Sequence, residues 1–131
     1  MKYVVIGIFK RGWKTMEHKM KLLSNPFNKI VDGSKEIEFR LYDDKRKEVK
    51  IGDTIEFSKL PNLIKKLNVE VVALYQYSTF KELLFFLGYK DNELEEKVEG
   101  MYSIYNHEQE KKHGVLGIKI KKLEEEKEDV V

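Results

Sequence analysis

The chain has 131 residues, a length typical of one domain, and its apolar fraction of 41% is enough for a hydrophobic core and excludes a disordered protein. It has no cysteine, which excludes disulfides and thiolate metal sites. The formal net charge is only +2, but residues 1–50 hold 13 Lys or Arg against 7 Asp or Glu. This basic part favours an anionic partner such as nucleic acid about as well as it favours simple surface solvation.

Residues 1–15 form an N-terminal extension that we expect to be a strand or an arm. Residues 4–9 are apolar and β-branched, and Lys10-Arg11 follow without a small-residue cleavage site. We therefore expect no secretory signal. No apolar run is long enough to span a membrane, and we expect a cytoplasmic protein that is monomeric or a weak homodimer through this arm, with Trp13 as a candidate contact.

The remaining elements follow from apolar periodicity and from helix caps. Asn25-Pro26 starts a short helix and Gly33 ends it, while Ser78 or Thr79 starts a helix that ends at Gly88. The expected strands are residues 4–9, 19–23, 35–41, 54–58, 69–77 and 115–121, and the expected helices are residues 26–32, 79–87, 92–105 and 106–112. Residues 124–131 are an acidic tail that we expect to be disordered or frayed.

The strand that begins near Lys35 carries the most informative residues. Side chains alternate along a strand, so Glu38 and Arg40 share one face, and Ile37, Phe39 and Leu41 share the other, which we expect to face the core. A lysine, a carboxylate and a guanidinium at the entrance of one strand predict a site for an anionic or nucleotide-like ligand. The expected core residues of three strands are Ile37, Phe39, Ile55, Phe57, Leu116 and Ile118.

Five sequence elements in order resemble the ASCH domain, which is related to the PUA RNA-binding domains. The first is the signature G-x-K-x-x-E-x-R, filled by Gly33, Lys35, Glu38 and Arg40. The others are Pro26-Phe27, the run from Arg40 to Arg46 followed by Gly52-Asp53, the tyrosine-rich Met101–Tyr105, and Gly114–Ile118. The resemblance extends from about Glu17 to Leu123.

This resemblance implies a fold and a function. The fold is α+β, a PUA-like mixed β-barrel of five to six strands with three to four short helices, formed by residues 16–123. The function is binding of RNA or a nucleotide in a basic cleft around the signature. We expect no cofactor and no metal, since His18, His107 and His113 are too scattered for a metal site.

Each candidate site residue also has a structural explanation. Lys35 and Glu38 are the candidate catalytic pair, but Glu38 and Arg40 together are at least as well explained as a structural ion pair. Lys45 and Arg46 are candidate phosphate contacts or solvated turn residues. Two tyrosines complete the ligand-binding set, Tyr42 and Tyr105; the helical spacing of Tyr105 and Tyr102 favours core packing over stacking on a base.

The sequence leaves open whether the protein is an enzyme. One branch of the resembled superfamily is an amidohydrolase that acts on N-acetylated cytidine, and another is ribonuclease-like. The amidohydrolase branch has threonine where this chain has Glu38, and its catalytic glutamate has no clear counterpart, with Glu82 the nearest position. The alternative function is therefore a small metal-independent hydrolase that uses Lys35 and Glu38. The sequence does not name the substrate.

Overall fold

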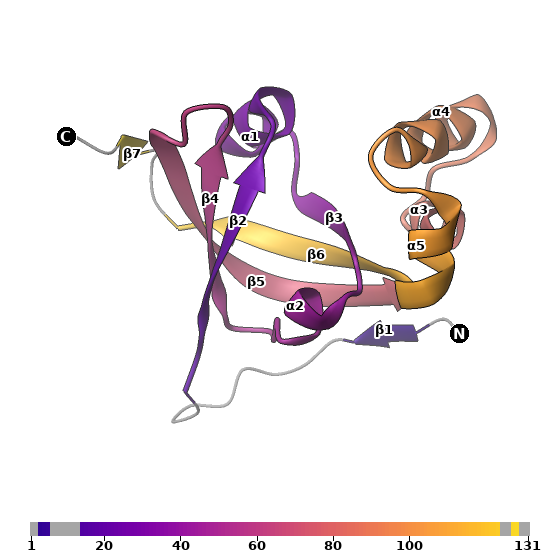
Figure 1. Cartoon of the computed structure of the whole chain (residues 1–131), viewed down its shortest axis with the longest axis horizontal. Helices are drawn as coiled ribbons and strands as arrows, with labels where there is room; N and C mark the ends of the chain where they lie inside the picture. Colours follow the sequence, from indigo (N-terminus) through magenta and orange to yellow (C-terminus); the bar gives the residue numbers. More distant parts are fainter. Residues whose placement is uncertain (1–2, 6–13, 124–126, 129–131) are drawn as a thin grey trace. The chain divides into compact units, whose positions relative to one another are not determined.

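A mixed β-sheet forms the centre of the fold. The computed structural model describes residues 3–5, 14–123 and 127–128 (Figure 1). Within them, the strand order is β2-β4-β5-β6-β3, and β1 and β7 also pair with β5. The strands are β1 (Tyr3–Val5), β2 (Glu17–Leu22), β3 (Ile37–Leu41), β4 (Thr54–Lys59), β5 (Lys65–Tyr77), β6 (Val115–Lys122) and β7 (Lys127–Glu128).

The described residues divide into two compact units, and the first contains β2, β4 and α1 (Ser24–Val31). β2 runs parallel to β4, with His18 opposite Ile55, and β4 runs antiparallel to β5, with Phe57 opposite Leu67. Alternate residues of these strands are buried, because side chains alternate between the two faces of a sheet. The largest buried side chains of this unit are Phe27, Ile55, Phe57, Leu67, Val69, Val71 and Ile118.

The second unit comprises Phe39–Glu48 and Leu74–Gly117 together with β1. Its helices are α2 (Asp44–Lys47), α3 (Phe80–Phe86), α4 (Asp91–Tyr102) and α5 (His107–His113). Figure 1 shows α3, α4 and α5 gathered together. Their core is built around Phe80, Leu83, Leu84 and Leu94.

Local sequence explains where these helices begin and end. The Thr79 hydroxyl accepts a hydrogen bond from the Glu82 backbone N–H at the start of α3, as an N-cap residue does. Asn106 and Gln109 form a reciprocal capping box at the start of α5. Gly114 follows α5 with φ of 72°, and a Cβ there would lie 3.0 Å from the Tyr77 carbonyl oxygen, so the position favours glycine.

The structure adds two elements that the sequence did not predict. Residues 44–47 form α2, where a basic turn was expected, and the Asp43 carboxylate caps it. Lys127–Glu128 form β7 and pair with β5, so this part of the expected disordered tail is paired. The predictions about Trp13 and about most of residues 1–15 and 124–131 lie outside the described residues. Within the described part of the chain, no helix is both long enough and apolar enough to cross a bilayer.

The expected alternation along β3 is wrong at Glu38, which the sequence pattern places on the outer face. Glu38 is only 5% exposed, whereas Ile37 and Phe39 are half-buried. Leu41 is buried as expected, and Phe39 packs against the core of its unit. A carboxylate at the inner position is tolerated because it has a cationic partner, Lys35. Ile55, Phe57, Leu116 and Ile118 are buried as expected.

A buried carboxylate links three elements of the second unit. Glu110 of α5 is 5% exposed and accepts hydrogen bonds from the Phe80 backbone N–H at 2.8 Å and from the Tyr102 hydroxyl at 2.6 Å. Phe80 N–H lies in the first turn of α3 and has no partner within that helix. Burial and the bonded, negatively charged Glu110 raise the pKa of Tyr102 to about 12.

This raised pKa predicts a loss of stability at high pH. The native state holds the Tyr102 proton more tightly than the unfolded chain, whose tyrosines ionise near pH 10. The stabilisation is complete below pH 10 and is lost as the pH rises through about 12. Urea unfolding should show that Tyr102→Phe is destabilising at pH 8, and that this difference shrinks above pH 10. A difference that stays constant up to pH 11.5 would contradict the assignment.

Candidate functional site

The loop after α1 positions Lys35. Gly33 has φ of 86°, and the Lys35 backbone N–H donates to the Lys29 carbonyl oxygen at 3.0 Å. The Ser34 backbone N–H donates to the Asp32 carboxylate at 2.8 Å. These bonds fold the loop back on the end of α1, so the main chain at Lys35 has a defined position.

The Lys35 side chain lies against Glu38. Its Nζ is 3.4 Å from the Glu38 Oε1, and the two side chains are 18% and 6% exposed. Both are therefore largely removed from water, and the lysine is the more accessible of the two. Such a pair holds an ammonium group in one place, where it can bind an anion or stabilise a developing negative charge.

The candidate residues from Arg40 to Arg46 belong to the other unit. Asp43 accepts the Arg46 backbone N–H at 3.0 Å and the Arg46 Nη1 at 3.1 Å, so one carboxylate both caps α2 and orients the guanidinium. Lys45 is exposed, and Arg40 and Tyr42 are half-buried. The Nζ of Lys47 lies 5.6 Å from the centre of the Tyr42 ring, which is within cation–π range.

Tyr105 packs inside the helical part of its own unit. Its ring stacks on the buried Phe80 ring, with centroids 5.6 Å apart and an interplanar angle of 18°. Tyr102 is bonded to Glu110 and stacks on His107 with centroids 3.9 Å apart. The packing explanation that the sequence left open thus accounts for the observed contacts of both tyrosines.

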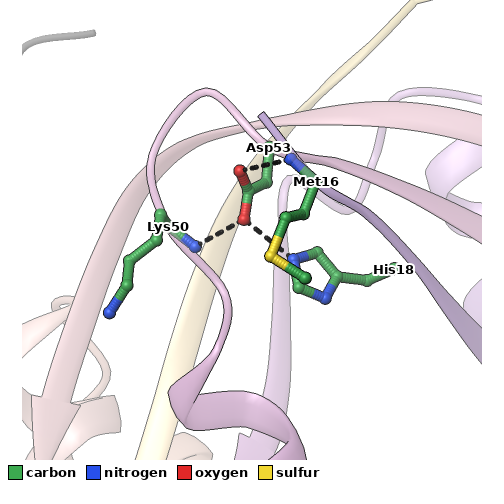
Figure 2. Close-up of polar contacts among 4 residues, drawn as sticks. All are labelled: Met16, His18, Lys50 and Asp53. Carbon is green, nitrogen blue, oxygen red and sulfur yellow. Dashed lines mark hydrogen bonds and ion pairs between the residues drawn. The ribbon is translucent and has the colours of Figure 1, made fainter. Parts of the chain in front are cut away.

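Sequence reasoning missed a buried polar cluster around Asp53. Figure 2 shows three donors around its carboxylate: the backbone N–H of Met16 at 3.1 Å, the backbone N–H of Lys50 at 2.9 Å, and His18 Nε2 at 2.8 Å. Asp53 and His18 are 3% and 8% exposed. A signal was present in the sequence, because His18 alternates with Met20 and Leu22, the two buried apolar residues of β2.

The candidate residues of the two units offer lysine, arginine and carboxylate groups. Among the residues that the structure describes, no three His, Asp or Glu side chains are placed to hold a metal ion together. The polar groups near the signature are suited to binding anions and to acid–base chemistry.

Comparison with protein families decides the relationship. The family model described as "ASCH domain" matches residues 20–124. The chain belongs to the ASCH domain family. This membership confirms the resemblance inferred from the signature, and ASCH domains are PUA-like and generally bind RNA. No protein with a curated description matches the chain.

Solved structures agree with the assignment to the ASCH domain. The crystal structure of hypothetical protein PH0355 is 37% identical, with a TM-score of 0.71, over 82% of this chain and 100% of that one. The solution NMR structure of protein PF0455 from Pyrococcus furiosus is 35% identical, with a TM-score of 0.61, over 83% and 99% of the two chains. The crystal structure of a mutant of ZmASCH from Zymomonas mobilis is 14% identical, with a TM-score of 0.58, over 80% and 67%, and shows the fold alone.

These likenesses confirm the expected α+β, PUA-like fold of this ASCH protein. The division into an extension, residues 16–123 and a tail stays a prediction. The site roles of Lys35, Glu38, Arg40, Tyr42, Lys45, Arg46 and Tyr105 also stay predictions.

Proposed function

We propose that this ASCH protein binds RNA or a nucleotide phosphate with the basic residues of the signature and of the segment that follows it. The proposal rests mainly on the contact between Lys35 and Glu38. The buried carboxylate holds the more accessible ammonium group in place at 3.4 Å. A cation positioned in advance loses little side-chain freedom when a phosphate binds.

Arg46 supports the same function. Asp43 holds its guanidinium through Nη1, and one oxygen of Asp43 is already used to cap α2. Arginine is suited to phosphate because its planar group presents several donors. Lys45, exposed on the same short helix, adds a second cation to this segment. Arg40 and Tyr42 complete the proposed ligand-binding set.

Filter binding of a single-stranded RNA oligonucleotide at two salt concentrations tests this function. Lys45→Ala should weaken binding about equally for different RNA sequences and reduce the salt slope by roughly one, because one phosphate contact is lost. Lys112→Ala, an equal charge change at an exposed position of α5, should change neither quantity. The proposal is wrong if the wild type binds neither RNA nor nucleotides at low salt, or if the two variants behave alike.

A second candidate function is hydrolysis. The same contact favours it, since a lysine beside a buried carboxylate is an arrangement that can transfer protons. The substrate class would be a modified nucleoside with an amide bond, such as N-acetylated cytidine, or a phosphodiester of RNA. A homodimer through residues 1–15 stays a further prediction.

A further inference from the structure

We propose that the surface formed by α3 and α4 is a docking site for a basic, amphipathic segment of a partner protein. This surface, the α3–α4 surface, consists of Lys81, Phe85 and Phe86 on α3 and of Asp91, Glu95 and Glu99 on α4. It is distinct from the residues proposed to bind RNA, so the inference does not depend on that function.

Two successive aromatic residues of α3 are exposed. Phe85 is 65% exposed and Phe86 is 47% exposed, although α3 buries Phe80, Leu83 and Leu84 completely or nearly so. Single exposed apolar residues are ordinary on protein surfaces, but neighbouring large ones with a charged rim are typical of interaction sites. The chain thus presents aromatic surface beyond what the packing of α3 requires.

The two aromatic rings differ in how they are held. Phe86 packs against Tyr75 and Tyr77 of β5, with ring centroids 5.6 and 5.4 Å apart. These contacts fix the end of α3 on the sheet of its own unit. Phe85 is the more exposed of the two rings and is available to an apolar side chain of a partner.

An acidic row lies next to this aromatic face. Lys81 precedes Phe85 by one helical turn, so the two share a face of α3. The Nζ of Lys81 lies 3.7 Å from the Glu95 Oε1, which places Glu95 beside that face. Glu99 lies one turn after Glu95 on α4, Asp91 is the first residue of that helix, and both are exposed.

The negative charge of α4 indicates which class of partner the surface would bind. Residues 91–102 contain five acidic residues, Lys97 as the single basic one, and Leu94 as the single buried one. Phosphates of RNA and anionic lipids would be repelled by this helix. A second copy seated symmetrically on the same surface would bring two acidic rows together. In a segment with lysines or arginines beside apolar residues, the basic side chains can pair with the carboxylates and the apolar side chains can pack on the exposed aromatic ring.

Binding of a synthetic peptide to the full chain tests the inference. The probe is a 14-residue helix of leucine and lysine at helical spacing, and the matched probe has glutamate in place of lysine. We expect the lysine peptide to bind and to shift the amide NMR signals of α3 and α4 first, while the glutamate peptide does not bind. Phe85→Ser and Glu95→Lys should each weaken binding of the lysine peptide by about tenfold or more.

Two control variants separate a docking site from general attraction to acidic surface. Glu108→Lys makes the same charge change at an exposed position of α5, and Leu23→Ser removes a side chain of the other unit that is 58% exposed. Both should bind the peptide like the wild type. Equal weakening by Glu95→Lys and Glu108→Lys would overturn the inference.

Other occupants give different results. RNA or anionic vesicles that shift the α3 and α4 signals would overturn the inference, and so would a wild-type dimer that Phe85→Ser converts to a monomer. Failure of the RNA proposal leaves the inference intact, because the α3–α4 surface contains none of the residues proposed to bind RNA. Glu95→Lys should therefore retain the RNA affinity of the wild type.

Discussion

Asp53→Ala should lower the free energy of unfolding by about 3–5 kcal/mol, because it removes the acceptor of one buried and two part-buried donors. Two of these donors are backbone N–H groups, of Met16 and Lys50, and the main chain fixes their direction. The Asp53 carboxylate joins the start of β2 to the turn before β4. In a chain of this size, the melting temperature should fall by roughly 10–15 °C.

Two further variants show whether the cluster acts as argued. His18→Leu should cost less than Asp53→Ala, because the carboxylate keeps its two backbone donors. Asp44→Ala changes the charge equally at a fully exposed side chain and should leave the melting temperature unchanged. Calorimetry of the three variants measures these effects. If the melting temperature of Asp53→Ala equals that of the wild type, the cluster contributes nothing to stability.

Local signals predicted most of the elements. Caps and glycines placed α3 and α5 to within about two residues, because those side chains act on the adjacent backbone. The expected cap of α1, Asn25, is wrong, because the helix already begins at Ser24 and its N-cap, Leu23, makes no side-chain hydrogen bond. Alternation predicted the buried faces of β4 and β6, where Ile55, Phe57 and Ile118 are fully buried. α2 escaped prediction because it is a four-residue helix without a buried residue, and it therefore has no apolar periodicity.

The conformation of the preceding loop limited the prediction of β3. The sequence pattern put Glu38 outside, since a carboxylate is rarely buried without a partner. Its partner, Lys35, lies in the preceding loop, and the conformation of Gly33 and the bond from Lys35 N–H to Lys29 bring it there. Strand periodicity alone carries no information about this loop.

The polar cluster at Asp53 was missed for a related reason. Gly52-Asp53 reads as an ordinary turn, and the donors to its carboxylate lie at two other places in the sequence. Only the parallel pairing of β2 with β4, which sets Glu17 opposite Thr54, brings Met16 and His18 close to Asp53. The pairing partner of an edge strand follows from tertiary packing, so sequence pattern did not reveal it.

Lys35→Arg should separate the two candidate functions of the signature. Arginine keeps the positive charge beside Glu38 but does not give up a proton at neutral pH. If Lys35 only binds a phosphate, RNA affinity should stay within a few-fold of the wild type. If Lys35 transfers a proton in hydrolysis, turnover of N-acetylated cytidine or of an RNA oligonucleotide should fall by about 10²–10⁴-fold while RNA affinity is kept.

Lys35→Met completes the test by removing the charge. We expect at least about a tenfold loss of RNA affinity, and also some loss of stability, because the buried Glu38 carboxylate loses the ammonium group 3.4 Å away. Lys35→Met with Glu38→Gln should recover stability without recovering affinity, which separates folding from binding. Lys29→Met makes the same charge change at an exposed position of α1 and should leave affinity unchanged. Equal affinities for Lys35→Met and Lys29→Met would show that the Lys35–Glu38 pair is structural.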